Sequence, residues 1–278
     1  MRTLRAVTLG ILALAIAPLT AVHAQSLTID YYTIAESDQD GNHLAFGSFD
    51  NEVQSALGPD GLPVLNTTAY GCMSDCYNPV GAPKDVLANG EITYWSPALN
   101  NGGPGGKSDV TFTGTGTLTL PVCVTTCLFG TPYNFFPPNG TGSSDANGFQ
   151  AATLTGTLVV PNTVTSETLS FAIGADDMAF AFLNGNEVCD LGGVHGSTAG
   201  TCVAPFTVGP GSYSLDVFFV DVNESQAGLY FNVLTSGVTV SPTGPTTTVP
   251  EPATLTLLGA SLFGLGLQRR RRARVTRP

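Results

Sequence analysis

Residues 178–191, MAFAFLNGNEVCDL, are the stretch that decides the fold of this chain. The first six alternate between large and small apolar side chains, Asn184-Gly185 follows, and residues 186–191 return. Asn-Gly is the favoured two-residue turn of β-hairpins because both turn positions need a positive φ. The stretch therefore predicts a tight β-hairpin.

The rest of the segment 25–236 has the same character. No part of it keeps a helical period for three turns, whereas runs rich in Thr, Val, Phe and Tyr are frequent, as strands prefer. We predict strands at 27–33, 110–120, 152–160, 168–173, 213–220 and 228–234, and one short helix at 50–57. Gly and Pro clusters mark turns between them. The fold class predicted is all-β, a β-sandwich or Greek-key barrel.

Acidic residues flank the hairpin. Asp176-Asp177 precede it, and Asp190 and His195 follow its turn. A further loop after the strand 213–220 carries Asp221 and Asn223, which are candidate ligands together with Asp176, Asp177 and Asp190. Adjacent carboxylates repel each other unless a cation or several N–H donors offset their charge. Ca²⁺, which prefers carboxylate and carbonyl oxygens, would do so; the alternative is that these acids are solvated loop residues.

Charge is distributed unevenly. The chain has 278 residues, with 10 Lys or Arg against 21 Asp or Glu. Between residues 25 and 249, however, the only basic side chains are Lys84 and Lys107. Without a basic surface to meet phosphates, this segment is excluded as a nucleic-acid binder.

Residues 1–24 have the pattern of a secretory signal peptide. Arg2 and Arg5 precede a short apolar run, and Val22-His23-Ala24 offers a cleavage site. The alternative is an uncleaved membrane anchor, for which the run is short compared with the ~20 residues of a membrane span.

The C-terminal region has a tripartite pattern. A Pro/Thr-rich linker is predicted at 237–248, and Pro250-Glu251-Pro252 then precede an apolar stretch at 253–267, predicted as a short hydrophobic helix. Six arginines end the chain: Arg269, Arg270, Arg271, Arg272, Arg274 and Arg277. Residues 249–278 resemble the PEP-CTERM sorting signal of Gram-negative bacteria. That resemblance implies export, an exosortase-type sorting enzyme as partner, transient inner-membrane anchoring, and delivery to the cell surface or an exopolysaccharide matrix. A plain tail anchor is the alternative.

Six cysteines lie in the exported segment, an even number that suggests disulfides. Sequence cannot choose among the 15 connectivities, and we predict pairing between neighbours. The predicted pairs are Cys72–Cys76, Cys123–Cys127 and Cys189–Cys202. A zinc site made of the first four is the alternative, although His43 and His195 are not spaced as its ligands.

The hairpin and its flanking acids resemble the signature of the fibro-slime domain, a branch of the PA14-like β-sandwich superfamily. The matching blocks, in chain order, are 57–64, 91–95, 135–142, 176–195 and 213–219, and the resemblance covers about residues 26–236. It implies a Ca²⁺ site in which Asp176 and Asp177, joined by a cis peptide, are paired ligands. Asp221 would be the third ligand, with Asn223 and Ser225 as carbonyl donors.

In PA14-like lectins the ion also meets vicinal sugar hydroxyls, so the resemblance implies carbohydrate binding. Two departures, Ala175 in place of an acid and Ala179 in place of an aromatic residue, weaken the sugar site more than the calcium site. His195 and Asp190 are further candidate ligand-binding residues, although a His in Gly-Gly-Val-His-Gly often only caps a tight turn. Trp95 is either a sugar-stacking platform or a core residue.

Three functions were weighed on these residues. The first is a non-enzymatic surface or matrix protein with a calcium-supported, glycan-binding domain. The second is a structural coat component in which Ca²⁺ only stabilises the fold. An enzyme is disfavoured because Asp176 and Asp177 are neighbours in the chain, whereas glycoside hydrolysis needs two carboxyl groups about 5–9 Å apart across the sugar.

Overall fold

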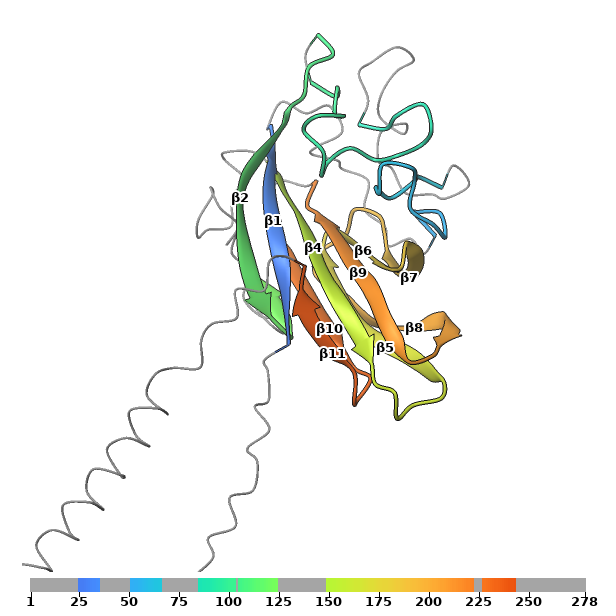
Figure 1. The fold of residues 1–278 in the computed structure, drawn as a ribbon. Helices are drawn as coiled ribbons and strands as arrows, with labels where there is room; N and C mark the ends of the chain where they lie inside the picture. The colour runs from blue at the N-terminus through green and yellow to red at the C-terminus, as the bar shows by residue number, and fades with distance from the viewer. Residues whose placement is uncertain are drawn as a thin grey trace, which may run out of the picture.

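The chain folds into two antiparallel β-sheets packed face to face (Figure 1). A computed structural model describes residues 25–35, 51–66, 85–103, 105–124, 149–222 and 227–243. Within these ranges the chain forms strands, turns and isolated bridges and no helix. The strands are β1 Ser26–Ile34, β2 Val110–Thr119, β3 Val122–Val124, β4 Phe149–Val160, β5 Glu167–Asp176, β6 Met178–Leu183, β7 Asn186–Leu191, β8 Thr198–Val208, β9 Gly211–Val220, β10 Gly228–Val233 and β11 Thr239–Pro242. The predicted all-β sandwich is confirmed.

The larger sheet has seven strands in the order β2-β1-β4-β9-β6-β7, with β11 also paired to β4. The smaller sheet has the order β3-β10-β5-β8. The predicted hairpin is β6–β7, and its turn residues Asn184 and Gly185 have φ values of 48° and 73°. Positive φ at both positions is what a two-residue hairpin turn of this kind requires, and Asn-Gly meets it at low cost.

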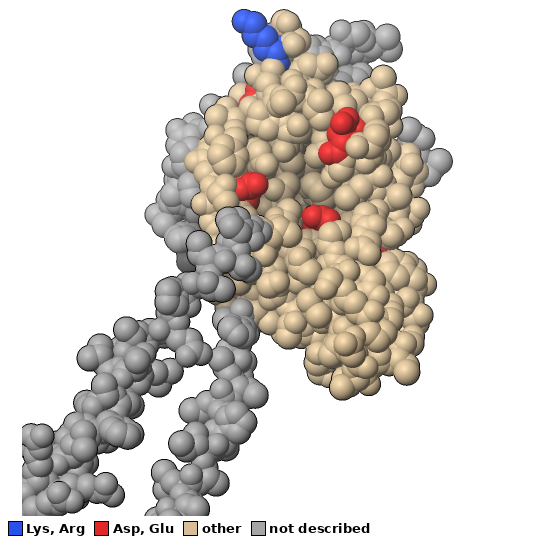
Figure 2. Space-filling view, viewed as in Figure 1, with Lys and Arg blue, Asp and Glu red and all other residues tan. Residues whose placement is uncertain are grey.

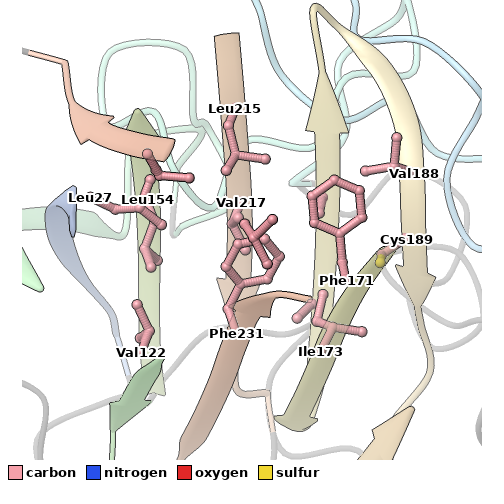
Figure 3. Packing of buried hydrophobic residues seen from close by; sticks show 14 of the residues in the cluster. Leu27, Val122, Leu154, Phe171, Ile173, Val188, Cys189, Leu215, Val217 and Phe231 are labelled. Atoms are coloured by element: carbon pink, nitrogen blue, oxygen red, sulfur yellow. The ribbon is translucent and has the colours of Figure 1, made fainter. Parts of the chain in front are cut away.

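The main core fills the space between the sheets. Alternate residues of each strand point inward, because successive side chains of a strand face opposite sides. Leu154, Leu215 and Val217 of the seven-stranded sheet face Phe171 and Phe231 of the four-stranded sheet (Figure 3). Phe171 and Phe231 stack with ring centroids 6.0 Å apart.

A second core covers the outer face of the seven-stranded sheet. Here the segments 51–66 and 85–103, which we call the loop layer, pack against the outward side chains of β6 and β9. Trp95 is 4% exposed, and its Nε1–H donates to the Phe219 carbonyl at 2.7 Å. Its ring packs edge-on against the ring of Phe218, with the ring centroids 5.1 Å apart. Trp95 is therefore a core residue and not a sugar platform.

The predicted helix at 50–57 is wrong over its described residues, 51–57. Instead of bonding to each other along a helix, their main-chain groups bond to the hairpin and to the rest of the loop layer. Ala56 bridges Asn186, Leu57 N–H donates to the Gly185 carbonyl, and Val53 bridges Leu65. The segment thus covers the free edge of β7.

Three strands were not predicted from the sequence. β3 is only three residues long, and β8 contains Pro205, which a bulge on an edge strand tolerates. β11 is short and ends in Pro242, yet Val240 is 4% exposed in the main core. The sandwich therefore extends to Pro242, beyond the predicted domain end at residue 236 and into the predicted linker 237–248.

A disulfide joins Cys189 of β7 to Cys202 of β8, across the two sheets, as predicted. The pairs Cys72–Cys76 and Cys123–Cys127 involve residues outside the described ranges or side chains that are not described. Outside them also lie the predicted signal peptide, 1–24, and the predicted C-terminal helix. Over the part of the chain that the structure describes, we find no helix of the length and hydropathy needed to cross a bilayer.

Candidate functional site

The candidate site lies where the chain passes between the two sheets at one end of the sandwich. Asp176 ends β5 in the smaller sheet, and Met178 begins β6 in the larger one, so Asp176–Asp177 is the crossing. The loops after β7 and after β9 cross back at the same end. Three sheet-to-sheet crossings therefore bring together residues that are distant in the sequence.

Strand register explains the meeting of Asp177 with Asp221. Met178 pairs with Val220 in the antiparallel ladder of β6 and β9, so the residue before Met178 lies opposite the residue after Val220. The Asp221 side chain lies close enough to the Asp177 carboxyl group to lower its pKa. Both side chains are buried, Asp177 at 1% exposed and Asp221 at 0%.

Main-chain donors hold the Asp177 carboxylate. The N–H of His195 donates to Oδ1 at 3.1 Å, and the N–H of Val222 donates to Oδ2 at 3.0 Å. One donor comes from the loop after β7 and the other from the loop after β9. The Asp176–Asp177 peptide bond is cis, as the family resemblance implies.

Asp176 is bound by the loop that precedes β8. Ser197 donates to its Oδ2 twice, from the backbone N–H at 3.1 Å and from the hydroxyl at 2.8 Å. His195 lies beside this carboxylate, and its Nδ1 is 3.0 Å from the Gly196 carbonyl, which fits a protonated Nδ1. Its Nε2 is buried and has no hydrogen-bond partner among the described residues.

Burial dominates the electrostatics of the site. The pKa of Asp177 is raised to about 7, chiefly by burial and also by the charge of Asp176, while the N–H groups of Val222 and His195 oppose the increase. Burial also raises the pKa of Asp176, against the donors of Ser197, and lowers the pKa of His195. The fold thus places carboxyl groups where ionisation without a counter-charge is unfavourable.

Basic side chains do not supply that counter-charge in the described part of the chain. Lys107, which is exposed, is the one Lys or Arg in the described ranges. Figure 2 shows blue atoms of Lys or Arg at one end of the molecule and red atoms of Asp and Glu in separate small groups. Among the described residues, N–H donors and the Ser197 hydroxyl are seen to offset the charge of the site.

The donor set fits a hard divalent cation in its chemistry. Asp176, Asp177 and Asp221 offer carboxylate oxygens, the ligands that Ca²⁺ prefers, and an oxygen that accepts one N–H keeps a second lone pair. Among the described residues, however, no three His, Cys, Asp or Glu side chains already converge as a metal cluster. Calcium would need further oxygens, and the predicted donors Asn223 and Ser225 lie outside the described residues.

The remaining candidates fall in different places. Asp190 is on β7, opposite Phe180 of β6, and its Oδ2 accepts the Val53 N–H at 2.9 Å in the loop layer. Its carboxylate is therefore tied to the loop layer. Ser197 was missed from the sequence, because a single Ser directly after the Gly-rich stretch 192–196 has no distinctive spacing.

The acids with raised pKa values give the metal-free protein a defined pH dependence. Burial raises the pKa of Asp177 from 3.8 to about 7, and burial with the Asp190 charge raises that of Glu52 from 4.5 to about 7. The folded state then binds more protons than the unfolded state above about pH 4, so stability falls as pH rises through 7. Each of these two acids changes the free energy of unfolding by on the order of 3 kcal/mol over this interval. His195, whose pKa is lowered by burial, changes it in the opposite direction.

We expect the melting temperature in EDTA, followed by far-UV circular dichroism, to fall as the pH is raised from 5 to 8. The variant Asp177→Asn should flatten the profile, because it cannot ionise at this position. A melting temperature that rises over the same interval would contradict the assignment.

Comparison with known protein families identifies a motif in the C-terminal region. Residues 248–272 match the PEP-CTERM protein-sorting motif. The match contains Pro250, Glu251 and Pro252 and confirms the predicted sorting signal. The motif marks an exported protein that is sorted to the cell surface.

The chain is also similar to solved β-structures. The PA14 domain of the antifreeze protein MpAFP is 22% identical (TM-score 0.26), and the match covers 34% of this chain and 53% of that chain, so this chain spans about half of its length. A PA14 sugar-binding domain from an RTX adhesin is 15% identical, with a TM-score of 0.33. The match covers 78% of this chain and 95% of that domain. The A domain of epithelial adhesin 9 from Candida glabrata, in complex with Galβ1-4GlcNAc, is 11% identical, with a TM-score of 0.32. The match covers 78% of this chain and 85% of that domain. No curated protein sequence matches the chain.

Proposed function

We propose that this chain is an exported, non-enzymatic protein of the cell surface or exopolysaccharide matrix that binds carbohydrate with the help of Ca²⁺. The observation that supports the proposal is the crossing itself, where Asp176 and Asp177 accept N–H groups from neighbouring loops and Asp221 follows the strand register opposite Asp177. The sorting motif at 248–272 supports the cell-surface location in this proposal. An exosortase-type enzyme would process the chain at the inner membrane after signal-peptide cleavage.

Calcium is the cation favoured by this site. All three side chains are carboxylates, and hard oxygen donors select Ca²⁺ or Mg²⁺ over softer metals. Asp176, Asp177 and Asp221 would hold the ion, with Asn223 as a further proposed ligand. A divalent charge would offset the repulsion that the buried carboxyl groups otherwise relieve by protonation.

The position of the site at the loops supports the carbohydrate-binding part of the proposal. Ca²⁺ takes 6–8 oxygen ligands, so vicinal hydroxyl groups of a sugar can complete the shell that the protein leaves incomplete. Ser197 is exposed beside Asp176 and adds a hydroxyl at the rim. The protein's own residues would thus orient the sugar and hold the ion.

The arrangement disfavours glycoside hydrolysis. Asp176 and Asp177 are consecutive, and both accept hydrogen bonds from neighbouring loops. Two such carboxyl groups cannot easily lie on opposite faces of one sugar ring, as the reaction requires.

A glycan array probed with the full-length chain tests the proposal. We expect binding to at least one glycan class in Ca²⁺, and its loss in EDTA and in Asp177→Asn. Glu167→Gln, which removes the same charge from β5 far from the crossing, should bind as the wild type does. Binding that survives EDTA, or is absent in Ca²⁺, would reject calcium-dependent glycan binding.

A structural coat protein is the second candidate. Ala179, where lectins of this type carry an aromatic residue, is fully buried in the main core and cannot stack on a sugar. In this case Ca²⁺ would raise the melting temperature while the array stayed blank.

A further inference from the structure

Glu52, in the loop layer, is a buried carboxyl group that is not part of the Asp176–Asp177 site. Its side chain is 0% exposed, and neither Oε1 nor Oε2 has a hydrogen-bond partner among the described residues. Buried polar atoms in folded proteins are almost always hydrogen-bonded, and buried charges are paired or bound to metals. Glu52 therefore has two buried oxygens whose ligand has to be identified.

A second carboxylate lies beside Glu52. The Asp190 Oδ2 accepts the N–H of Val53, the residue that follows Glu52, at 2.9 Å. Asp190 is the cross-strand partner of Phe180, whose side chain lies in the outer core, so Asp190 faces the loop layer. The two carboxyl groups interact electrostatically, and Asp190 adds to the effect of burial in raising the pKa of Glu52.

The backbone around Glu52 is fixed on both sides. Its carbonyl accepts the N–H of Asn66 at 2.8 Å, and Val53 bridges Leu65. On the other side, Glu187 of β7 donates its N–H to the Ser55 carbonyl at 3.0 Å. These main-chain hydrogen bonds fix the backbone that carries Glu52 beside β7.

Protonation alone would leave this arrangement incomplete. A proton cancels the charge of Glu52, but a neutral carboxyl group buried without a donor or acceptor still lacks its hydrogen bonds. A metal ion satisfies both oxygens at once, since Glu binds Ca²⁺ in a bidentate manner. Lys107, the one described Lys or Arg, is exposed and lies in the loop before β2.

We propose that Glu52 and Asp190 hold a second divalent cation, Ca²⁺, which fastens the loop layer to the edge strand β7. Both protein ligands are carboxylates, which selects a hard cation, and main-chain oxygens or water would complete the shell. The ion would join residues 138 positions apart in the chain, on the outer face of the seven-stranded sheet. This site is separate from the Asp176–Asp177 crossing and does not depend on the proposed function.

Stoichiometry tests the proposal. In equilibrium dialysis of the full-length chain against CaCl₂, we expect two ions for each wild-type chain and one for Glu52→Gln. Asp177→Asn should also bind one, at the other site, and the double variant none. Glu167→Gln, the matched change on β5, should keep two.

The variants separate this proposal from the proposed function. Loss of one ion in Glu52→Gln but not in Asp177→Asn would support the Glu52 site and reject the crossing site. If Glu52→Gln binds as many ions as the wild type, the Glu52 site is rejected. Asp190→Asn should repeat the result of Glu52→Gln, and it decides the outcome if that variant fails to fold.

Thermal melting gives an independent readout. In EDTA at pH 8, Glu52→Gln should melt above the wild type because it removes repulsion between two buried charges. In Ca²⁺ the order should reverse, because the wild type alone gains the ion. An order that is the same in both buffers would overturn the proposal.

Discussion

Asp177→Asn is expected to weaken calcium binding at the crossing between the sheets by at least about a hundredfold. Loss of a group that only supports a metal ligand already costs 10- to 100-fold in affinity, and Asp177 is proposed as a ligand itself. Asn keeps the shape and one oxygen acceptor for the N–H groups of His195 and Val222, so the fold should persist. Calorimetric titration of the full-length chain with CaCl₂ measures the change.

Asp221→Asn provides the second variant for this prediction. It lies across the strand register from Asp177, and its own loss should weaken the same binding event. Glu167→Gln controls for the reduced negative charge of the whole molecule. If both Asp variants titrate as the wild type does, calcium binding at the crossing is rejected.

Trp95→Ala is expected to lower the free energy of unfolding by about 3–5 kcal/mol, the usual cost of removing a buried Trp. The ring is 4% exposed, packs edge-on against Phe218, and donates to the Phe219 carbonyl. Trp95 therefore couples the loop layer to the sheet by both packing and a hydrogen bond. Urea denaturation followed by far-UV circular dichroism measures the loss.

Trp95→Phe separates the two contributions. It keeps most of the packing but leaves the Phe219 carbonyl without this donor, for about 1–3 kcal/mol. Leu234→Ala is the surface control, since Leu234 is 46% exposed, and it should change stability by no more than about 0.5 kcal/mol. A loss below about 1 kcal/mol in Trp95→Ala would mean that the loop layer is not packed on the sheet in solution.

Two features of the candidate site followed from short stretches of sequence, and the rest did not. Asp176-Asp177 stands out beside the Asn184-Gly185 turn because both are local patterns. That Asp221 meets Asp177 is a matter of register between β6 and β9, which the resemblance implied but spacing alone did not define. The donors Ser197 and Val222 come from two other loops, and no local pattern predicted either of them.

The amino-acid sequence by itself determined the parts that depend on neighbours along the chain. These are the hairpin, most of the strands, and the sorting motif at 248–272, because turn residues, alternation and short motifs act over a few positions.

Only the tertiary structure decided which face of the sheet each segment covers. The segment 51–57 contains no local signal against a helix, and it forms isolated bridges and bends instead because its main-chain groups bond to the hairpin and to the rest of the loop layer. Burial of Glu52 beside Asp190 arises in the same way, from residues far apart in the chain. Desolvation and charge pairing depend on such distant neighbours, which is why the acidic residues of this chain acquire their chemistry only in the folded protein.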